Sequence, residues 1–225
     1  MITRAQLIDV LFVIVPQSLL LDIGGPAEAF RLANLHREAR GLPPRFHLRF
    51  AGPAPTLPTS VGLTLGELIP LPDDLSTATW VVVVGQPTAH VTQVTPDLTA
   101  TAQWLNDRMR GELLDANTPH RLVTICSGTL LAARAGVLGT RRCTTHHELL
   151  PMLRTLAPQA QVIENRVFVV DGALYDAMGA HAVKVMDMAS AGRLPGARSR
   201  NVCRPGRASR GSYFCTHRRD SRSTE

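Results

Sequence analysis

One cysteine in this 225-residue chain stands where a protein can use a thiol in chemistry. Cys126 follows the apolar run from Leu122 to Ile125 and precedes Ser127-Gly128 and an alanine-rich stretch. This order predicts a strand, a sharp turn with the cysteine at its apex, and a helix. The unpaired N–H groups at the start of a helix favour a thiolate, so Cys126 is a candidate nucleophile or sensor. The alternative is a small buried hydrophobe, because cysteine is among the most buried residue types.

Two other candidate residues also follow apolar runs. Asp22 comes shortly after Ile8 to Val15, and Gly85 comes directly after Trp80 to Val84. Such runs alternate with helical stretches, which predicts an α/β fold with a parallel sheet sandwiched by helices. Ligands collect at the carboxyl ends of the strands in such sheets, so we expect Asp22, Gly85 and Cys126 to meet there. Asp22 has a second interpretation, as the cap of the helix that follows it.

The remaining patterns predict the elements that hold these residues. Helices are expected over 26–37, 97–109, 128–135, 146–156 and 179–190. A strand is expected over 46–50 and a short one over 142–145. We predict a small hairpin around Val61-Gly62, a second one across Asn165-Arg166, and a short strand over 173–175.

Charge divides the chain into two predicted regions. Residues 191–225 hold nine arginines and two acidic residues, whereas residues 1–190 hold 15 basic and 16 acidic residues. We therefore expect a near-neutral folded domain over 1–190, without the basic surface typical of nucleic-acid binding. The rest is expected to be a basic, disordered tail.

The sequence also limits location and cofactors. The chain has neither an apolar run of 18 residues nor a signal-peptide pattern at its start, which predicts a cytoplasmic protein without a membrane span. Its four cysteines lack metal-ligand spacing and are expected to be reduced thiols. We expect no metal and no cofactor.

Three motifs carry a resemblance to a known family. They are Leu21 to Phe30 (LDIGGPAEAF), Ile125 to Gly128 (ICSG) and Cys143 to His146 (CTTH). Together they resemble the ThiJ/PfpI superfamily, whose fold is flavodoxin-like and of the class I glutamine amidotransferase type. The likeness covers roughly residues 7–175 and is closest to the N-terminal domains of GlxA-type regulators of the AraC family.

The resemblance implies roles for five residues. Cys126 matches the cysteine of the nucleophile elbow, and Asp22 matches the acidic residue that approaches its thiol. Gly85 and the Ser127 backbone N–H match the oxyanion-type donors beside the thiol. His146 matches a histidine near the pocket, although it has a second interpretation as a cap of the threonine-rich turn.

The chain also departs from the family pattern. Protease-like members have histidine directly after the cysteine, where this chain has Ser127, so a Cys–His hydrolase is disfavoured. Cys143 is expected in the core. Regulators of this branch continue with Thr/Ser-Ala-Gly and later a helix-turn-helix module, whereas this chain continues with Asp176-Ala177-Met178-Gly179. The arginine-rich composition that follows suggests a shifted reading frame, which translation of the other frames from about codon 175 would test.

These observations leave three candidate functions. The first is the ligand-sensing domain of a GlxA/AraC-type regulator, truncated before its DNA-binding module, that binds a small metabolite. The resemblance implies a homodimer, and DNA would be a specific partner only if a helix-turn-helix module were present. The second is an isonitrile-hydratase-like or deglycase-like enzyme that uses Cys126, Asp22 and His146. The third is a redox sensor that works through oxidation of Cys126.

Overall fold

The computed structural model describes residues 7–75, 78–110, 118–177, 204–205 and 213–214. The strands are β1 (Ile8–Val13), β2 (Phe46–Gly52), β3 (Leu57–Pro58), β4 (Thr64–Leu65), β5 (Ile69–Pro70), β6 (Thr79–Val83), β7 (Arg121–Ile125), β8 (Arg142–Cys143), β9 (Gln161–Val162), β10 (Phe168–Asp171), β11 (Leu174–Ala177), β12 (Arg204–Pro205) and β13 (Tyr213–Phe214). The helices are α1 (Leu20–Glu38), α2 (Thr88–Val91), α3 (Pro96–Met109), α4 (Gly128–Arg134) and α5 (Leu150–Leu156), with a 3-10 turn η2 at His147–Leu149.

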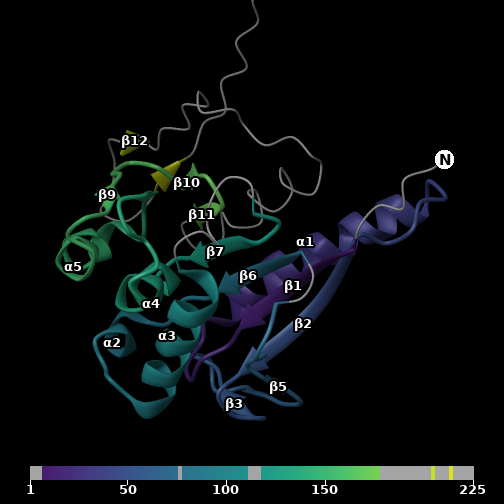
Figure 1. Cartoon of the computed structure of the whole chain (residues 1–225), viewed down its shortest axis with the longest axis horizontal. Coiled ribbons are helices and arrows are strands. Elements are labelled where there is room, and N and C mark those ends of the chain that lie inside the picture. The colour runs from purple at the N-terminus through teal and green to yellow at the C-terminus, as the bar shows by residue number, and fades with distance from the viewer. Residues whose placement is uncertain (1–6, 76–77, 111–117, 178–203, 206–212, 215–225) are drawn as a thin grey trace, which may run out of the picture.

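Seven strands form one sheet in the order β10-β11-β7-β6-β1-β2-β5 (Figure 1). Neighbouring strands are parallel except β10 and β11, which run antiparallel. Helices flank both faces of the sheet, which confirms the predicted α/β, flavodoxin-like architecture. The structure adds one antiparallel strand at an edge, so the sheet is mixed and mostly parallel.

The central strands are the apolar runs that the sequence indicated. In β1, Leu11 and Val13 pack into the hydrophobic cluster on one face, whereas Val10 and Phe12 pack into the cluster on the opposite face. All four side chains have 0% exposure. A strand that is buried on both faces needs apolar residues at successive positions, and this is why β1, β6 and β7 were recognisable in the sequence.

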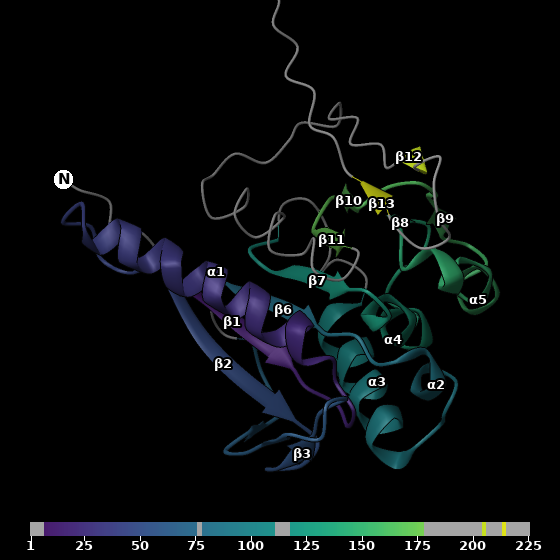
Figure 2. The same ribbon diagram turned by 180° about the vertical axis from the view of Figure 1, so that it is seen from behind.

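Different helices cover the two faces. Helix α1 lies along β1, β2 and β6, in front of them in Figure 2 and behind them in Figure 1. Its Ile23 and Phe30 join the same cluster as Phe12. The opposite cluster takes residues from α3, α4 and α5, among them Leu105, Leu130 and Leu153. Because α1 follows β1 and α4 follows β7, both helices start at the edge of the sheet where the carboxyl ends of these strands lie.

Helix α1 begins six residues earlier than the sequence pattern predicted. It starts at Leu20 and contains Pro26, the residue that was expected at its beginning. Burial of Ile23 and Pro26 on the face toward the sheet carries the helix through Gly24-Gly25, which outweighs their low helix propensity. Asp22 consequently lies in the first turn, and the helix start has no side-chain cap. The interpretation of Asp22 as a helix cap is therefore wrong.

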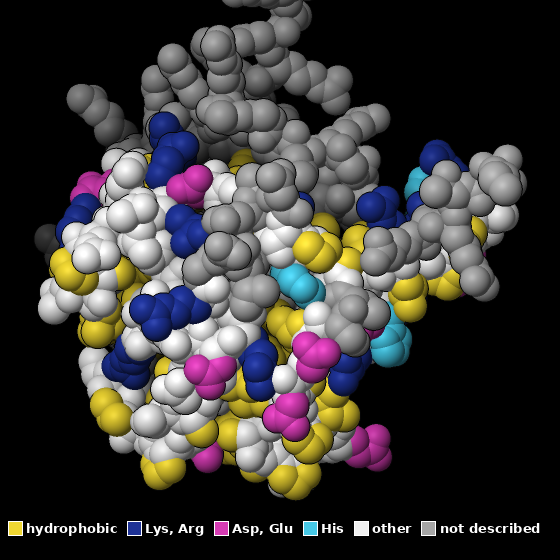
Figure 3. Space-filling model, in the orientation of Figure 1, with side chains coloured by type: hydrophobic (Ala, Val, Ile, Leu, Met, Phe, Trp, Pro, Cys, Tyr) yellow, Lys and Arg dark blue, Asp and Glu magenta, His cyan; other side chains and the backbone are white. Residues whose placement is uncertain are grey.

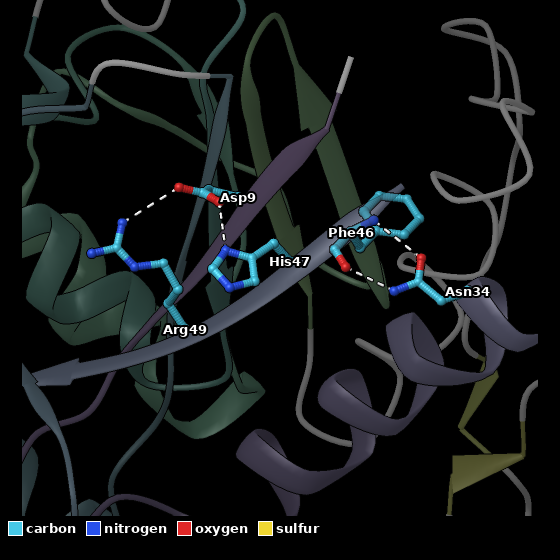
Figure 4. A network of polar contacts seen from close by, with 5 residues as sticks. All are labelled: Asp9, Asn34, Phe46, His47 and Arg49. Atoms are coloured by element: carbon cyan, nitrogen blue, oxygen red, sulfur yellow. Dashed lines mark hydrogen bonds and ion pairs between the residues drawn. The ribbon is translucent and has the colours of Figure 1, made fainter. Parts of the chain in front are cut away.

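Polar contacts fasten α1 and β1 to β2 (Figure 4). The Asn34 side chain donates to the Phe46 carbonyl oxygen at 2.7 Å and accepts from the Phe46 N–H at 3.1 Å. On the neighbouring strand, the Asp9 carboxylate contacts His47 Nδ1 at 3.0 Å and Arg49 Nη1 at 3.4 Å. These contacts fix the end of the sheet that lies away from the carboxyl ends of the parallel strands.

One predicted hairpin is wrong and another is confirmed. Strands β3 and β4 pair antiparallel around Val61-Gly62, as expected. The residues on either side of Asn165-Arg166 do not pair with each other, because β9 pairs in parallel with β8 and β10 pairs with β11. The hairpin turns instead at Gly172-Ala173, where Gly172 has a φ of +59° that glycine adopts without strain.

The predicted helix over 179–190 and the predicted domain boundary at residue 190 lie outside the described residues. Beyond that boundary, β12 and β13 pair antiparallel. Among the described helices, none combines the length and apolar character needed to cross a membrane. Basic and acidic side chains are interspersed over the described surface that Figure 3 shows.

Candidate functional site

The candidate site lies at the carboxyl ends of the central strands. From β1 the chain moves outward to β2, and it later returns to β6 on the other side of β1. Strand order therefore reverses between β1 and β6, and in open α/β sheets this reversal leaves a crevice where ligands bind. Asp22 follows β1, Gly85 follows β6 and Cys126 follows β7. All three belong to this edge of the sheet, as predicted.

Gly85 is the point where the other candidate residues converge. A Cβ atom added at Gly85 would lie 2.7 Å from Asp22 Oδ2, 3.0 Å from Cys126 Cβ and 3.1 Å from Ser127 Oγ. No larger residue fits there without moving its neighbours. The structure thus brings together four of the five predicted site residues.

The Cys126 backbone has an unusual conformation. Its φ is +54°, a left-handed value that is uncommon for a residue other than glycine. The Cys126 N–H donates to the Ala177 carbonyl oxygen at 2.8 Å, and the Cys126 carbonyl oxygen accepts from Thr145 Oγ1 at 2.7 Å. The residue is half-buried at the junction of β7 and α4. That this turn is a nucleophile elbow stays a prediction.

Asp22 is a buried carboxyl group that lacks a full set of partners. Its residue is 3% exposed, and its Oδ2 makes no hydrogen bond within the described structure. Burial raises the pKa of Asp22 to about 6, against a smaller lowering by the Gly85 backbone N–H. A carboxyl group with this pKa exchanges a proton near neutral pH. The Gly85 N–H, which was predicted as an oxyanion-type donor, acts on Asp22 in this structure.

Ser127 joins the turn after β6 to the start of α4. Its Oγ donates to the Gln86 carbonyl oxygen at 2.7 Å and accepts from the Gln86 N–H at 2.6 Å. Gln86 Nε2 in turn donates to the Pro16 carbonyl oxygen at 2.6 Å, beyond the end of β1. The side chain of Ser127 therefore holds three loops together. That its backbone N–H acts as an oxyanion-type donor stays a prediction.

His146 follows Thr145, which contacts Cys126, but the described contacts of its own ring are with His147 and Glu148. Its ring packs against His147 at 4.3 Å between centroids, and its Nδ1 is 3.8 Å from Glu148 Oε2. Burial, with help from His147, lowers the pKa of His146. At the start of η2, where His146 is the N-cap residue, no side-chain cap bond forms. The interpretation of His146 as a cap of the threonine-rich turn stays a prediction. The adjacent residue Thr145 donates to the Cys126 carbonyl oxygen, and a role for His146 itself in the pocket stays a prediction.

The second described cysteine has the opposite character. Cys143 is buried with 0% exposure in the cluster formed by α3, α4 and α5. Burial, together with Asp176 and Asp171, raises the pKa of its thiol to about 12. This agrees with the expectation of a core residue. Among the described residues, no group of three or more His, Cys, Asp and Glu side chains has the arrangement to hold a metal ion.

The sequence pattern missed one residue next to the site, Asp176. It lies in β11 beside Thr124 of β7, with 0% exposure. Its carboxyl oxygens contact Thr129 Oγ1 at 3.3 Å and the Thr144 N–H at 3.1 Å. The predicted strand ended at Tyr175, because an acidic residue does not read as part of a buried strand. The available signal was the substitution of Asp176 at the Thr/Ser position of the family pattern.

Comparison with known proteins finds one curated relative. No family model matches the chain. A protein of Streptomyces lividans, described as an uncharacterized protein in the cpoL 5′ region, is 31% identical over 142 residues. The alignment covers 62% of this chain and 87% of that protein.

Solved structures with the same fold include regulators and DJ-1 proteins. An AraC family transcriptional regulator from Pseudomonas putida has a TM-score of 0.63 at 19% identity, covering 84% of this chain and 93% of that one. DJ-1beta of Drosophila melanogaster has a TM-score of 0.58 at 15% identity, covering 81% and 88%. A ThiJ/PfpI family protein from Pseudomonas syringae has a TM-score of 0.59 at 17% identity, covering 80% and 66%.

Proposed function

We propose that the chain, which belongs to the same family as the Streptomyces lividans protein and shares its fold with a ThiJ/PfpI family protein, is the ligand-binding domain of an AraC-type transcription regulator. Its ligand is a small polar metabolite bound at the carboxyl ends of β1, β6 and β7. The fold shared with the Pseudomonas putida regulator supports this proposal. We further propose that it works in the cytoplasm as a homodimer, as the resemblance of its motifs implies.

The observation that carries the proposal is the convergence on Gly85. An unpaired carboxyl oxygen, the Cβ atom of the half-buried Cys126 and the Ser127 hydroxyl group surround a position that has no side chain of its own. Buried polar atoms without partners are costly, so proteins keep them chiefly where a ligand or a reaction uses them. Ligand binding would supply the missing partner of Asp22 Oδ2.

The pKa of Asp22 favours a second candidate, an enzyme. A carboxyl group with a pKa of about 6 beside the Cys126 Cβ can exchange a proton with a thiol or substrate at neutral pH. In isonitrile hydration, the Cys126 thiolate would add to the terminal carbon and Asp22 would protonate that carbon. Water would then displace the thiolate, release an N-substituted formamide and return the proton.

Two assays on the same variants separate these functions. The parent chain, Cys126→Ala and the control Gly24→Ala are assayed for turnover of an aryl isonitrile and of methylglyoxal. They are also screened for thermal stabilisation by a panel of polar metabolites. Turnover that is lost only in Cys126→Ala supports the enzyme. Stabilisation by a metabolite, lost in Cys126→Ala and without turnover, supports the sensor. If the chain turns over neither substrate and no compound binds at Cys126, both proposals are overturned.

A further inference from the structure

A fully buried acidic side chain lies behind the candidate thiol. Asp176 belongs to β11, which pairs in parallel with β7, and the next residue, Ala177, accepts the Cys126 N–H at 2.8 Å. No part of Asp176 is exposed, so a ligand that approaches from the solvent does not contact it. Burying a carboxyl group is expensive, which calls for a specific use of its two oxygens.

The first oxygen reaches Cys126 through a threonine. Asp176 Oδ1 lies 3.3 Å from Thr129 Oγ1, and the same hydroxyl lies 3.3 Å from the Cys126 carbonyl oxygen. Thr124 Oγ1 completes this group at 3.0 Å from Thr129 Oγ1. Thr129 has one hydroxyl hydrogen, so it can donate to only one of its neighbours.

The second oxygen reaches the same carbonyl from the other side. Asp176 Oδ2 accepts the Thr144 N–H at 3.1 Å, and the next residue, Thr145, donates its hydroxyl to the Cys126 carbonyl oxygen at 2.7 Å. The Thr144 hydroxyl is tied separately to the Ile163 carbonyl oxygen at 2.9 Å. Both carboxyl oxygens thus connect to one peptide group, that of Cys126.

We propose that Asp176 is a positioning residue for Cys126: through Thr129 and through Thr144-Thr145 it holds the Cys126 carbonyl group and so maintains the left-handed backbone that presents the thiol. The inference rests on the proposed function, in which Cys126 is the reactive or ligand-sensing group. A left-handed cysteine persists only where surrounding contacts fix it, and these two arms provide such contacts.

The arrangement works best with a neutral carboxyl group. A protonated Asp176 donates to Thr129, whose own hydrogen is then available to the Cys126 carbonyl oxygen, whereas an ionised Asp176 takes that hydrogen. Burial raises the pKa of Asp176, opposed by the Thr144 N–H and Thr129. The titratable group that interacts with it from the 143–145 segment is Cys143, whose raised pKa keeps that thiol uncharged.

The test measures how fast Cys126 reacts with iodoacetamide from about pH 6 to about pH 10, with mass spectrometry of the Cys126 peptide. The variants are Asp176→Asn, which keeps a donor and an acceptor of the same shape, and Asp176→Leu, which keeps neither. Asp171→Asn is the matched control, because Asp171 also accepts a backbone N–H, from Arg142 at 2.7 Å, and its described hydrogen bond does not lead to Cys126. Circular dichroism confirms that each variant is folded before alkylation.

We expect Asp176→Asn and Asp171→Asn to keep the parent rate and pH midpoint, and Asp176→Leu to change the rate at least about five-fold, as loss of a buried hydrogen bond implies. If Asp176→Leu does not fold, Thr129→Val and Thr145→Val remove one arm each and should each change the profile in the same sense. A parent-like profile in Asp176→Leu, or in both threonine variants, overturns the inference. So does an Asp176→Asn profile that is shifted like that of Asp176→Leu.

Alkylation needs neither a ligand nor turnover, so this result is independent of the proposed function. A chain without ligand binding or turnover, in which the alkylation profile still depends on Asp176, would overturn the proposed function and keep the positioning role. The reverse pattern would keep the function and remove Asp176 from its machinery.

Discussion

The Asp22 side chain lies in an environment that disfavours its ionised form. Burial raises its pKa from 3.8 to about 6. Below about pH 4 the carboxyl group is protonated in both the folded and the unfolded chain, so its burial does not make the free energy of unfolding depend on pH. As pH rises toward 6 the unfolded chain loses the proton first, and the folded state loses about 3 kcal/mol. Asp22 therefore acts against stability at neutral pH, as residues kept for function often do.

Asp22→Asn should remove this loss. Relative to the parent, we expect the free energy of unfolding of the variant to rise by about 2 to 3 kcal/mol between about pH 4 and pH 7. Urea denaturation of both chains at the two pH values measures the change. Asp107→Asn, at an exposed position of α3, is the control and should track the parent. A difference between the parent and Asp22→Asn that is the same at both pH values would contradict the raised pKa.

The two described cysteines should differ sharply in reactivity. Cys126 is half-buried at a turn, whereas Cys143 is buried and has a pKa of about 12, which leaves roughly one thiolate in ten thousand at pH 8. In the native chain at that pH, iodoacetamide should label Cys126 at least about ten times faster than Cys143. Peptide mass spectrometry gives both rates, and denatured protein serves as the reference. Equal labelling of the two in native protein would refute this assignment.

At the scale of elements, close backbone approach decides where glycine is required. A Cβ at Gly128 would overlap the Val83 carbonyl oxygen, which belongs to β6 and cannot move aside. With a larger residue, α4 could not stay at its present distance from β6. Gly128→Ala should cost about 2 kcal/mol or more in thermal or urea unfolding. Gly24→Ala is the control within α1, where a Cβ meets nothing within 4 Å, and it should gain about 0.5 to 1 kcal/mol. A neutral Gly128→Ala would show that α4 can shift.

The way in which each element is buried explains whether the sequence predicted it. Strands such as β1 are buried on both faces and carry unbroken apolar runs, so they were recognisable, and with them the edge where Asp22, Gly85 and Cys126 meet. The start of α1 and the pairing of β9 were misjudged because they depend on packing against distant residues. Asp176 was missed for a related reason: its burial is offset by Thr129 and Thr144, which contact it only in the folded chain.

At the scale of the whole molecule, charge is divided unevenly along the chain. Residues 1–190 carry 15 basic and 16 acidic groups, whereas residues 191–225 carry nine arginines against two acidic groups. The region that forms the sheet and the candidate site therefore attracts polyanions little, and any general affinity for DNA must come from the arginines. Such contacts neutralise phosphates without reading bases.

This division predicts non-specific, salt-sensitive DNA binding by the full chain. Fluorescence anisotropy with two duplexes of unrelated sequence should give similar affinities. If most of the nine arginines contact phosphates, both affinities should fall roughly a thousand-fold between about 50 and 200 mM salt. Replacing Arg218, Arg219 and Arg222 by glutamine should lower the slope of log affinity against log salt by about three. A ten-fold preference for one duplex that survives high salt would instead reveal base recognition, and the charge argument would then fail.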